Sequence, residues 1–149
     1  MNNRNTILNT IQDELKKYIT VANGFSCTPH TVRRGVYAFN DLQKRLPSVC
    51  FTFTQEVPFE DETYPMTYDD TDIKAMSIMF YGYAKANDAS DSDKIYDMVN
   101  DLEVFLQSTD FSYNEDLKIN SIEIKEAGPS DKVLSFIIDV SIFVNDDLE

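Results

Sequence analysis

Two long stretches of alternating residues constrain this chain more than any other feature. Residues 133–144 place an apolar side chain at every second position, from Leu134 to Val144. A period of two is typical of a β-strand with one buried face. Residues 73–85 carry apolar side chains in both alternating sets. That pattern predicts an interior strand of a sheet, covered on each side.

Apolar side chains at helical spacing mark two helices. Residues 6–19 repeat apolar positions three, four and seven residues apart, which predicts an amphipathic helix. A second stripe runs from Ile95 to Leu106 and predicts a helix that ends at about Ser108. Asp91 or Ser92 is the expected cap of that second helix.

Two further strands are expected, and a third region leaves room for others. Pro47 precedes a strand over 49–57, whose inner side is formed by Val49, Phe51, Phe53 and Val57. The strand over 117–124 changes its apolar parity between Ile119 and Ile122, which indicates a β-bulge. Residues 21–46 are rich in turn residues and leave room for one or two short strands, such as one within 31–37.

This order of elements predicts an α+β fold with two α-helices packed on one face of a mostly antiparallel β-sheet. A long loop or β-hairpin arm is expected around residues 58–71, which are acidic and contain two prolines. The length of 149 residues fits a single domain over 1–149. The polar N-terminal segment and the lack of a long apolar run predict neither a signal peptide nor a membrane span.

Charge is distributed unevenly along the chain. Residues 1–54 carry seven basic and three acidic side chains, whereas residues 55–149 carry six lysines and 23 acidic side chains. The formal net charge of −13 argues against nucleic acid as a general partner, because phosphate binding needs an excess of Lys and Arg. Two interpretations of the asymmetry stay open. The molecule is electrically two-sided and binds copies of itself or two different partners, or the acidic side chains simply solvate loops.

The sequence predicts no catalytic residue, no cofactor and no metal site. Cys27 and His30 form the one conceivable nucleophilic pair, but no activating context accompanies them, and both cysteines are expected to be reduced and buried. Asp69, Asp70 and Asp72 lack the spacing of a calcium-binding loop. The four glycines are scattered and form no phosphate-binding loop.

Charged pairs and exposed aromatic residues are the candidate subunit-interface residues. Basic pairs are expected to contact an acidic run, and tyrosines are favoured at interfaces. The candidates are Arg33, Arg34, Lys44 and Arg45 on the basic side, Glu60, Asp61 and Glu62 on the acidic side, and the tyrosines Tyr64 and Tyr68.

The order of the elements and two strand contexts together resemble a known family. The contexts are Leu-Pro-x-Val at 46–49 and Tyr-Gly-Tyr-Ala-Lys at 81–85. Over about residues 5–145 the chain resembles the tail terminator, or tail completion, proteins of tailed bacteriophages. The family has no catalytic signature, so the resemblance implies no catalytic residues.

The resemblance implies a structural virion protein of the phage neck. It implies a homo-oligomeric ring, a hexamer in this family, that caps the head-proximal end of the tail tube and ends tube polymerisation. The implied partners are the tail tube protein and the head connector or neck protein, with genomic DNA passing through the ring without specific binding. The implied location is the virion, after synthesis in the host cytoplasm. Alternative interpretations are another head–tail connector or tail tube protein, or a soluble acidic adaptor that binds a basic protein.

Overall fold

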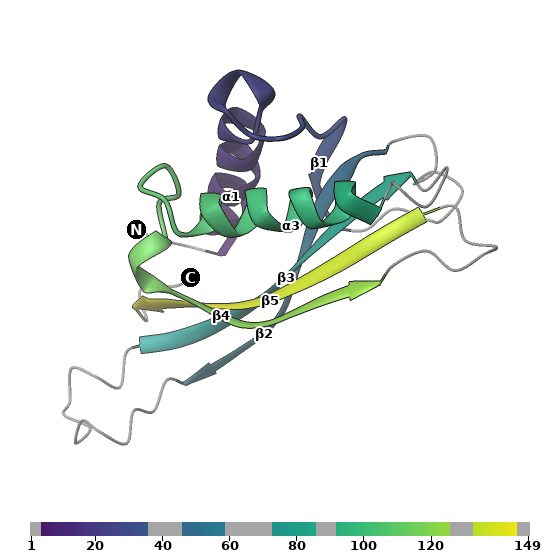
Figure 1. The fold of residues 1–149 in the computed structure, drawn as a ribbon. Coiled ribbons are helices and arrows are strands. Elements are labelled where there is room, and N and C mark those ends of the chain that lie inside the picture. The colour runs from purple at the N-terminus through teal and green to yellow at the C-terminus, as the bar shows by residue number, and fades with distance from the viewer. Residues whose placement is uncertain (1–3, 36–45, 59–72, 86–91, 126–132, 146–149) are drawn as a thin grey trace.

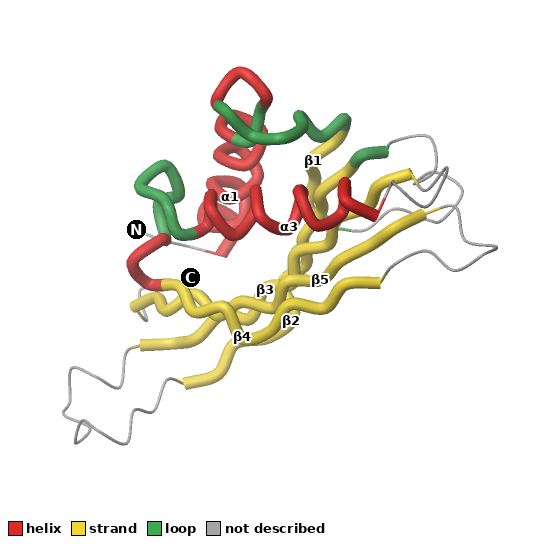
Figure 2. The backbone as a smooth tube through the Cα atoms, viewed as in Figure 1, coloured by secondary structure: helices red, strands yellow, loops and turns green. Residues whose placement is uncertain are grey.

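One five-stranded sheet, covered on one face by two helices, forms the described part of the molecule (Figures 1 and 2). The computed structural model describes residues 4–35, 46–58, 73–85, 92–125 and 133–145. Its strands, in chain order, are β1 (Thr31–Arg34), β2 (Ser48–Pro58), β3 (Ile73–Lys85), β4 (Leu117–Lys125) and β5 (Val133–Asn145). Its helices are α1 (Arg4–Tyr18) and α3 (Ser92–Leu106), with short 3₁₀ turns η1 (Val21–Asn23) and η4 (Asn114–Asp116). The predicted α+β fold class is confirmed.

The strands lie in the order β1-β2-β3-β5-β4. Only the β1–β2 pair is parallel, and the other three pairs are antiparallel. The strand predicted over 73–85 is therefore the central strand of the sheet, with the predicted bounds. The predicted arm around 58–71 and the predicted cap at Asp91 lie outside the described residues, as does the side chain of Ser92.

The core lies between the sheet and the two helices. Alternate side chains of β3 and β5, such as Phe80 and Ile138, are fully buried against α1 and α3. Gly82 lies directly opposite Phe136 in this layer, and a Cβ atom at position 82 would overlap the Phe136 ring. The glycine is therefore required by the close approach of an aromatic ring from the neighbouring strand.

Two bulges decide which side chains face the core. The predicted bulge in β4 is confirmed by a register shift between Ile119 and Ser121. A second shift, between Phe53 and Gln55 in β2, was not predicted. It inserts one extra residue, so Phe53 pairs with Ile78 on the helix side while Val57 pairs with Ala75 on the opposite face. The prediction that Val57 shares a side with Val49 and Phe51 is therefore wrong.

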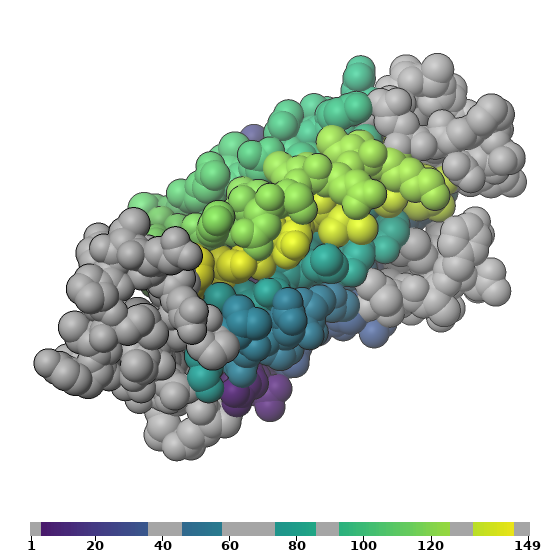
Figure 3. Space-filling model, turned by 90° about the horizontal axis from the view of Figure 1, so that it is seen from below, coloured from purple at the N-terminus to yellow at the C-terminus, as the bar shows by residue number. Residues whose placement is uncertain are grey.

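The second face of the sheet carries no described helix or strand (Figure 3). The view in Figure 3 looks onto this face, where β2, β3, β4 and β5 lie at the surface beside one another. The prediction that β3 is covered on each side is thus met on the helix side only, within the described residues. We call the second side the uncovered face.

Candidate assembly surfaces

The uncovered face presents large apolar and aromatic side chains in its centre. Met79, Tyr81 and Tyr83 of β3 lie half-buried there, beside Ile137 of β5. The Tyr81 hydroxyl contacts the Met79 sulfur at 3.4 Å. Aromatic residues and methionine are enriched where protein surfaces meet, so this face has the composition of an interface as well as that of a sheet surface.

The phenol of Tyr83 stays protonated at physiological pH. Burial raises the pKa of Tyr83 above its ordinary value of 10.0, and the nearby Cys50 and Tyr81 raise it further. A neutral phenol is a hydrogen-bond donor and acceptor, and here it lies on the same face as the apolar side chains of Met79 and Ile137. The centre of the uncovered face can thus bind another protein surface, and Asp139 of β5, which pairs with Met79, adds one carboxylate to it.

The two ends of the sheet differ in chemical character. We call one the acidic end. There β2 ends at Pro58, β3 begins at Ile73 and β5 ends at Asn145, and the register places these three termini side by side. The segments 59–72 and 146–149, which continue the chain from these termini, contain nine acidic and no basic side chains. Negative charge is thus concentrated at this end of the molecule.

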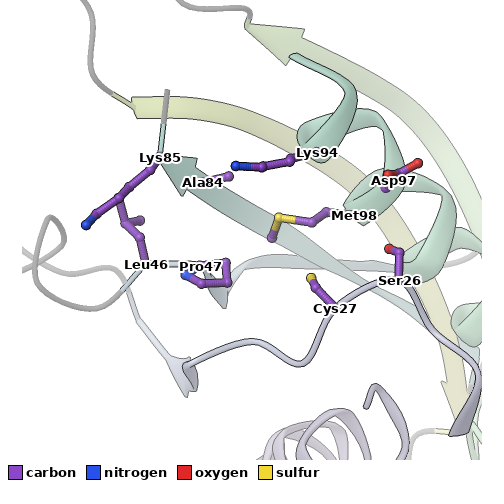
Figure 4. A pocket seen from close by; sticks show the side chains of 9 residues that line it. All are labelled: Ser26, Cys27, Leu46, Pro47, Ala84, Lys85, Lys94, Asp97 and Met98. Carbon is purple, nitrogen blue, oxygen red and sulfur yellow. The ribbon is translucent and has the colours of Figure 1, made fainter. Parts of the chain in front are cut away.

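The other end, where β3 ends and β2 begins, holds a pocket of about 280 Å³ (Figure 4). We call it the pocket end. Four segments that are distant in sequence meet there: the loop after α1, the residues before β2, the end of β3 and the first turns of α3. The lining residues are Ser26, Cys27, Leu46, Pro47, Ala84, Lys85, Lys94, Asp97 and Met98. No local sequence pattern indicates such a pocket, because it exists only once these segments are folded together.

Hydrogen bonds to Asp101 of α3 fix the loop that forms one wall of the pocket. The carboxylate of Asp101 accepts a hydrogen bond from the Ser26 backbone N–H at 3.1 Å and another from the Ser26 hydroxyl. In Figure 4 the Cys27 sulfur and the Met98 side chain both point into the space between this loop and α3. The loop wall thus presents the Cys27 sulfur to the pocket and is held in place by the charged carboxylate of Asp101.

Cys27 is not an activated nucleophile. Burial raises the pKa of its thiol, and the carboxylates of Asp101 and Asp97 raise it further. A thiol with a raised pKa holds little thiolate at neutral pH, and the thiolate is the reactive form. His30 lines a different pocket and its Nδ1 contacts the Thr31 hydroxyl at 2.9 Å, so the structure places Cys27 and His30 in separate pockets. The expectation that both cysteines are buried holds for Cys50, while Cys27 is half-buried.

The predicted basic pair Arg33-Arg34 does not form one patch. Successive residues of β1 point to opposite faces, so Arg34 lies on the helix side and Arg33 on the uncovered face. The Arg34 guanidinium donates a hydrogen bond to the side-chain oxygen of Asn9 on α1 at 3.0 Å. The Arg33 Nε donates to the backbone oxygen of Arg34 at 3.2 Å.

The other predicted interface residues lie outside the described part of the chain. They are Lys44, Arg45, Glu60, Asp61, Glu62, Tyr64 and Tyr68. The neighbouring strands nevertheless determine from which end of the sheet each of these residues continues. Lys44 and Arg45 immediately precede Leu46 at the pocket end, whereas the five others belong to the segment that leaves the acidic end.

Within the described residues, no group of three or more His, Cys, Asp or Glu side chains is arranged to hold a metal ion. Asp69, Asp70 and Asp72 lie outside that part of the chain. None of the described helices is both long and apolar enough to span a membrane.

No protein-family model matches this chain, and no curated protein sequence matches it significantly.

Proposed function

We propose that this protein is a structural subunit of a bacteriophage neck. In this proposal copies of the chain form a closed ring, a hexamer by resemblance to tail terminator proteins, that caps the tail tube and receives the head connector. The observation that carries the proposal is the chemical difference between the two ends of the sheet. One end continues into nine acidic side chains, and the other holds a pocket with two lysines among its lining residues.

Unlike ends favour a head-to-tail contact between copies. A contact between two different surfaces of one subunit is heterologous, and heterologous contacts close into rings or continue into filaments. An end rich in carboxylates repels its own copy and attracts a surface that carries lysines. The arrangement of charge thus supports assembly of identical subunits around an axis.

The uncovered face supports the same proposal. Its centre carries Met79, Tyr81 and Ile137 beside the carboxylate of Asp139, and α1 and α3 cover only the opposite face. In an assembled neck this face supplies a broad surface for contact with an adjoining protein, such as the tail tube. No step of the proposed function requires a catalytic group.

Electron microscopy of the purified protein, together with a phage that lacks it, tests the proposal. We expect closed rings of uniform size, and we expect the mutant phage to make tails of abnormal length that fail to join heads. A protein that stays monomeric at high concentration, and whose loss leaves tail length and head joining unchanged, contradicts the proposal. Open helical polymers in place of rings would instead identify a tube protein.

A second candidate function is a soluble adaptor that binds a basic protein. The nine acidic side chains that follow the acidic end favour it, because they would bind a basic surface without any need for self-assembly. A stable complex with a basic protein, formed by a subunit that does not associate with itself, distinguishes the adaptor from the ring subunit.

A further inference from the structure

We propose that the pocket at one end of the sheet receives the acidic segment 59–72 of a second copy of this chain. The inference rests on the proposed self-assembly and names the two surfaces that meet. The receptor is the pocket lined by Cys27, Leu46, Ala84 and Met98, with Lys85 and Lys94 also among its lining residues.

The chemistry of the pocket suits a peptide segment with apolar and acidic side chains. Its volume of about 280 Å³ is close to the lower limit of small-molecule pockets, which run from roughly 300 to 1,000 Å³. The walls formed by Pro47, Ala84 and Met98 are apolar, and Cys27 is kept as a neutral thiol. The lining carries two lysines and the carboxylate of Asp97, and the carboxylate of Asp101 lies against its Ser26 wall.

The segment 59–72 has the complementary composition. It contains six acidic side chains, no basic one, and four large apolar or aromatic residues, namely Phe59, Tyr64, Met66 and Tyr68. An aromatic or methionine side chain that fills an apolar pocket, with carboxylates beside lysines at the rim, is a common form of interface anchor. Lys44 and Arg45 directly precede Leu46 at the pocket end, and segments 86–91 and 126–132, which also adjoin this end, carry four acidic side chains and one lysine. The acidic end, with nine acidic side chains and no basic one in its adjoining segments, is thus much the more negative of the two.

The segment cannot reach the pocket of its own molecule. It leaves the sheet at Pro58 and returns at Ile73, whereas the pocket lies at the far end of β3, beside Ala84 and Lys85. Lys74 and Lys85 are 11 residues apart on this strand, a distance of about 36 Å at about 3.3 Å per residue. A loop of 14 residues anchored at one end of the sheet extends at most about 24 Å, half of its contour length. The occupant must therefore come from another copy.

This geometry makes the contact directional. Each copy donates a segment at its acidic end and accepts one at its pocket end, so every subunit in a chain of contacts has one donor and one acceptor. A closed ring satisfies all of them. An open filament leaves one pocket and one segment unfilled at its two ends.

Disulfide trapping tests the proposal directly, because Cys27 already lies in the pocket. The test protein carries Cys50→Ala and Tyr64→Cys, so that Cys27 and the introduced thiol are its only cysteines. Mild oxidation at alkaline pH is followed by non-reducing electrophoresis. We expect a ladder of covalent dimers, trimers and larger species. Mixing ¹⁴N- and ¹⁵N-labelled protein before oxidation should give linked peptides of mixed label that join positions 27 and 64.

Two matched controls show whether the ladder comes from a link between Cys27 and the thiol introduced at position 64. Adding Cys27→Ser should abolish it, whereas dimers that persist in this variant show a contact between two segments and overturn the proposal. Moving the new thiol to the exposed position Ser121, on β4, should give no ladder. Linked peptides of a single label show an intramolecular contact and also overturn the proposal.

Electron microscopy of the same oxidised samples separates this inference from the proposed function. Rings without the link between positions 27 and 64 overturn the pocket contact and leave the ring function standing. Filaments that contain the link confirm the pocket contact and overturn the ring. A protein that shows neither assembly nor link overturns both.

Discussion

The two ends of the sheet use the same strands in different ways. Along β2 the exposed fraction of the residue rises from 4% at Val49, on the helix side near the pocket end, to 42% at Val57, which the bulge turns to the uncovered face near the acidic end. At the pocket end, strands, a loop and α3 converge around a pocket, whereas at the acidic end the strands run out beyond the helices. The difference teaches that one strand can supply buried core at one end and, beyond a bulge, exposed side chains at the other.

A matched pair of substitutions on β2 should show the largest effect. Phe51→Ala removes a side chain that is 1% exposed and packs against Phe80 at a ring distance of 5.7 Å. We expect it to lower the free energy of unfolding by about 3–5 kcal/mol. Val57→Ala, near the acidic end, should cost less than about 0.5 kcal/mol. Urea denaturation followed by circular dichroism measures both, and equal losses would show that the two ends do not differ in this way.

Gly82→Ala should destabilise the sheet near its pocket end by about 1–3 kcal/mol. The new Cβ atom would overlap the ring of Phe136, which packs directly over this glycine. The double variant Gly82→Ala/Phe136→Leu provides the control, because a smaller side chain at 136 relieves the overlap. If the double variant is no more stable than expected from adding the two single losses, the ring is not the reason for the glycine.

Asp101→Asn should loosen the wall of the pocket and cost about 1 kcal/mol, since its carboxylate accepts two hydrogen bonds from Ser26. It should also lower the pKa of Cys27, because Asp101 is one of the groups that raise it. The rate at which a thiol reagent modifies Cys27, measured against pH, should therefore rise at a lower pH in the variant. Asp110→Asn, on an exposed turn, is the matched control and should leave that profile unchanged.

The pH dependence of stability follows from the same thiol. The folded state holds the Cys27 proton more tightly than the unfolded chain, whose thiol has the ordinary pKa of 9.0. The resulting stabilisation is fully present below about pH 9 and is lost as the pH rises through the folded pKa. In Cys27→Ala the alkaline decline of the free energy of unfolding should be smaller and should begin at a higher pH, where the raised pKa of Tyr83 still contributes to it. A decline of the same size in both proteins would assign it to other groups.

The smallest effect is expected at an ion pair near the acidic end. Arg4 at the start of α1 binds Glu56 of β2 through two contacts of 2.7 Å. The Arg4 side chain is 37% exposed, so Glu56→Gln should cost no more than about 1 kcal/mol, and less at high salt. Glu115→Gln, at an exposed site, is the control for the loss of one negative charge. A loss well above 1 kcal/mol would mean that the acidic end depends on this pair for its stability.

The fold was largely predictable because its strands follow simple periods. The alternation over 133–144 is uninterrupted, residues 73–85 are apolar in both alternating sets, and β3 has the bounds expected from the sequence. The bulge in β4 was visible as a change of parity between Ile119 and Ile122. The bulge in β2 was not visible, because Phe53 and Val57 are both apolar and conceal the extra residue between them.

The pocket could not be predicted from the sequence. Cys27, Leu46, Ala84 and Met98 come from four separate segments, and none has a neighbour in sequence that indicates a shared cavity. The sequence neighbours Arg33 and Arg34 show the converse, because residues that are adjacent in sequence are separated by the fold. Adjacent residues on a strand point to opposite faces, so two basic side chains that are neighbours in sequence do not share a surface.

Charge-swap complementation tests head-to-tail assembly most directly. One variant carries Lys85→Glu and Lys94→Glu at the pocket, another carries Glu60→Lys and Glu62→Lys in the acidic segment, and a third combines all four. Lys118→Glu, an exposed charge reversal on β4, is the control. In sedimentation velocity at about 0.1 M salt, where charges interact over about 10 Å, wild type and the control should assemble. Each two-site variant alone should remain monomeric. An equimolar mixture of the two should assemble with the variants in alternation, and the combined variant should assemble again, because both samples pair only segments and pockets of opposite charge. Full assembly of each two-site variant by itself would contradict the account.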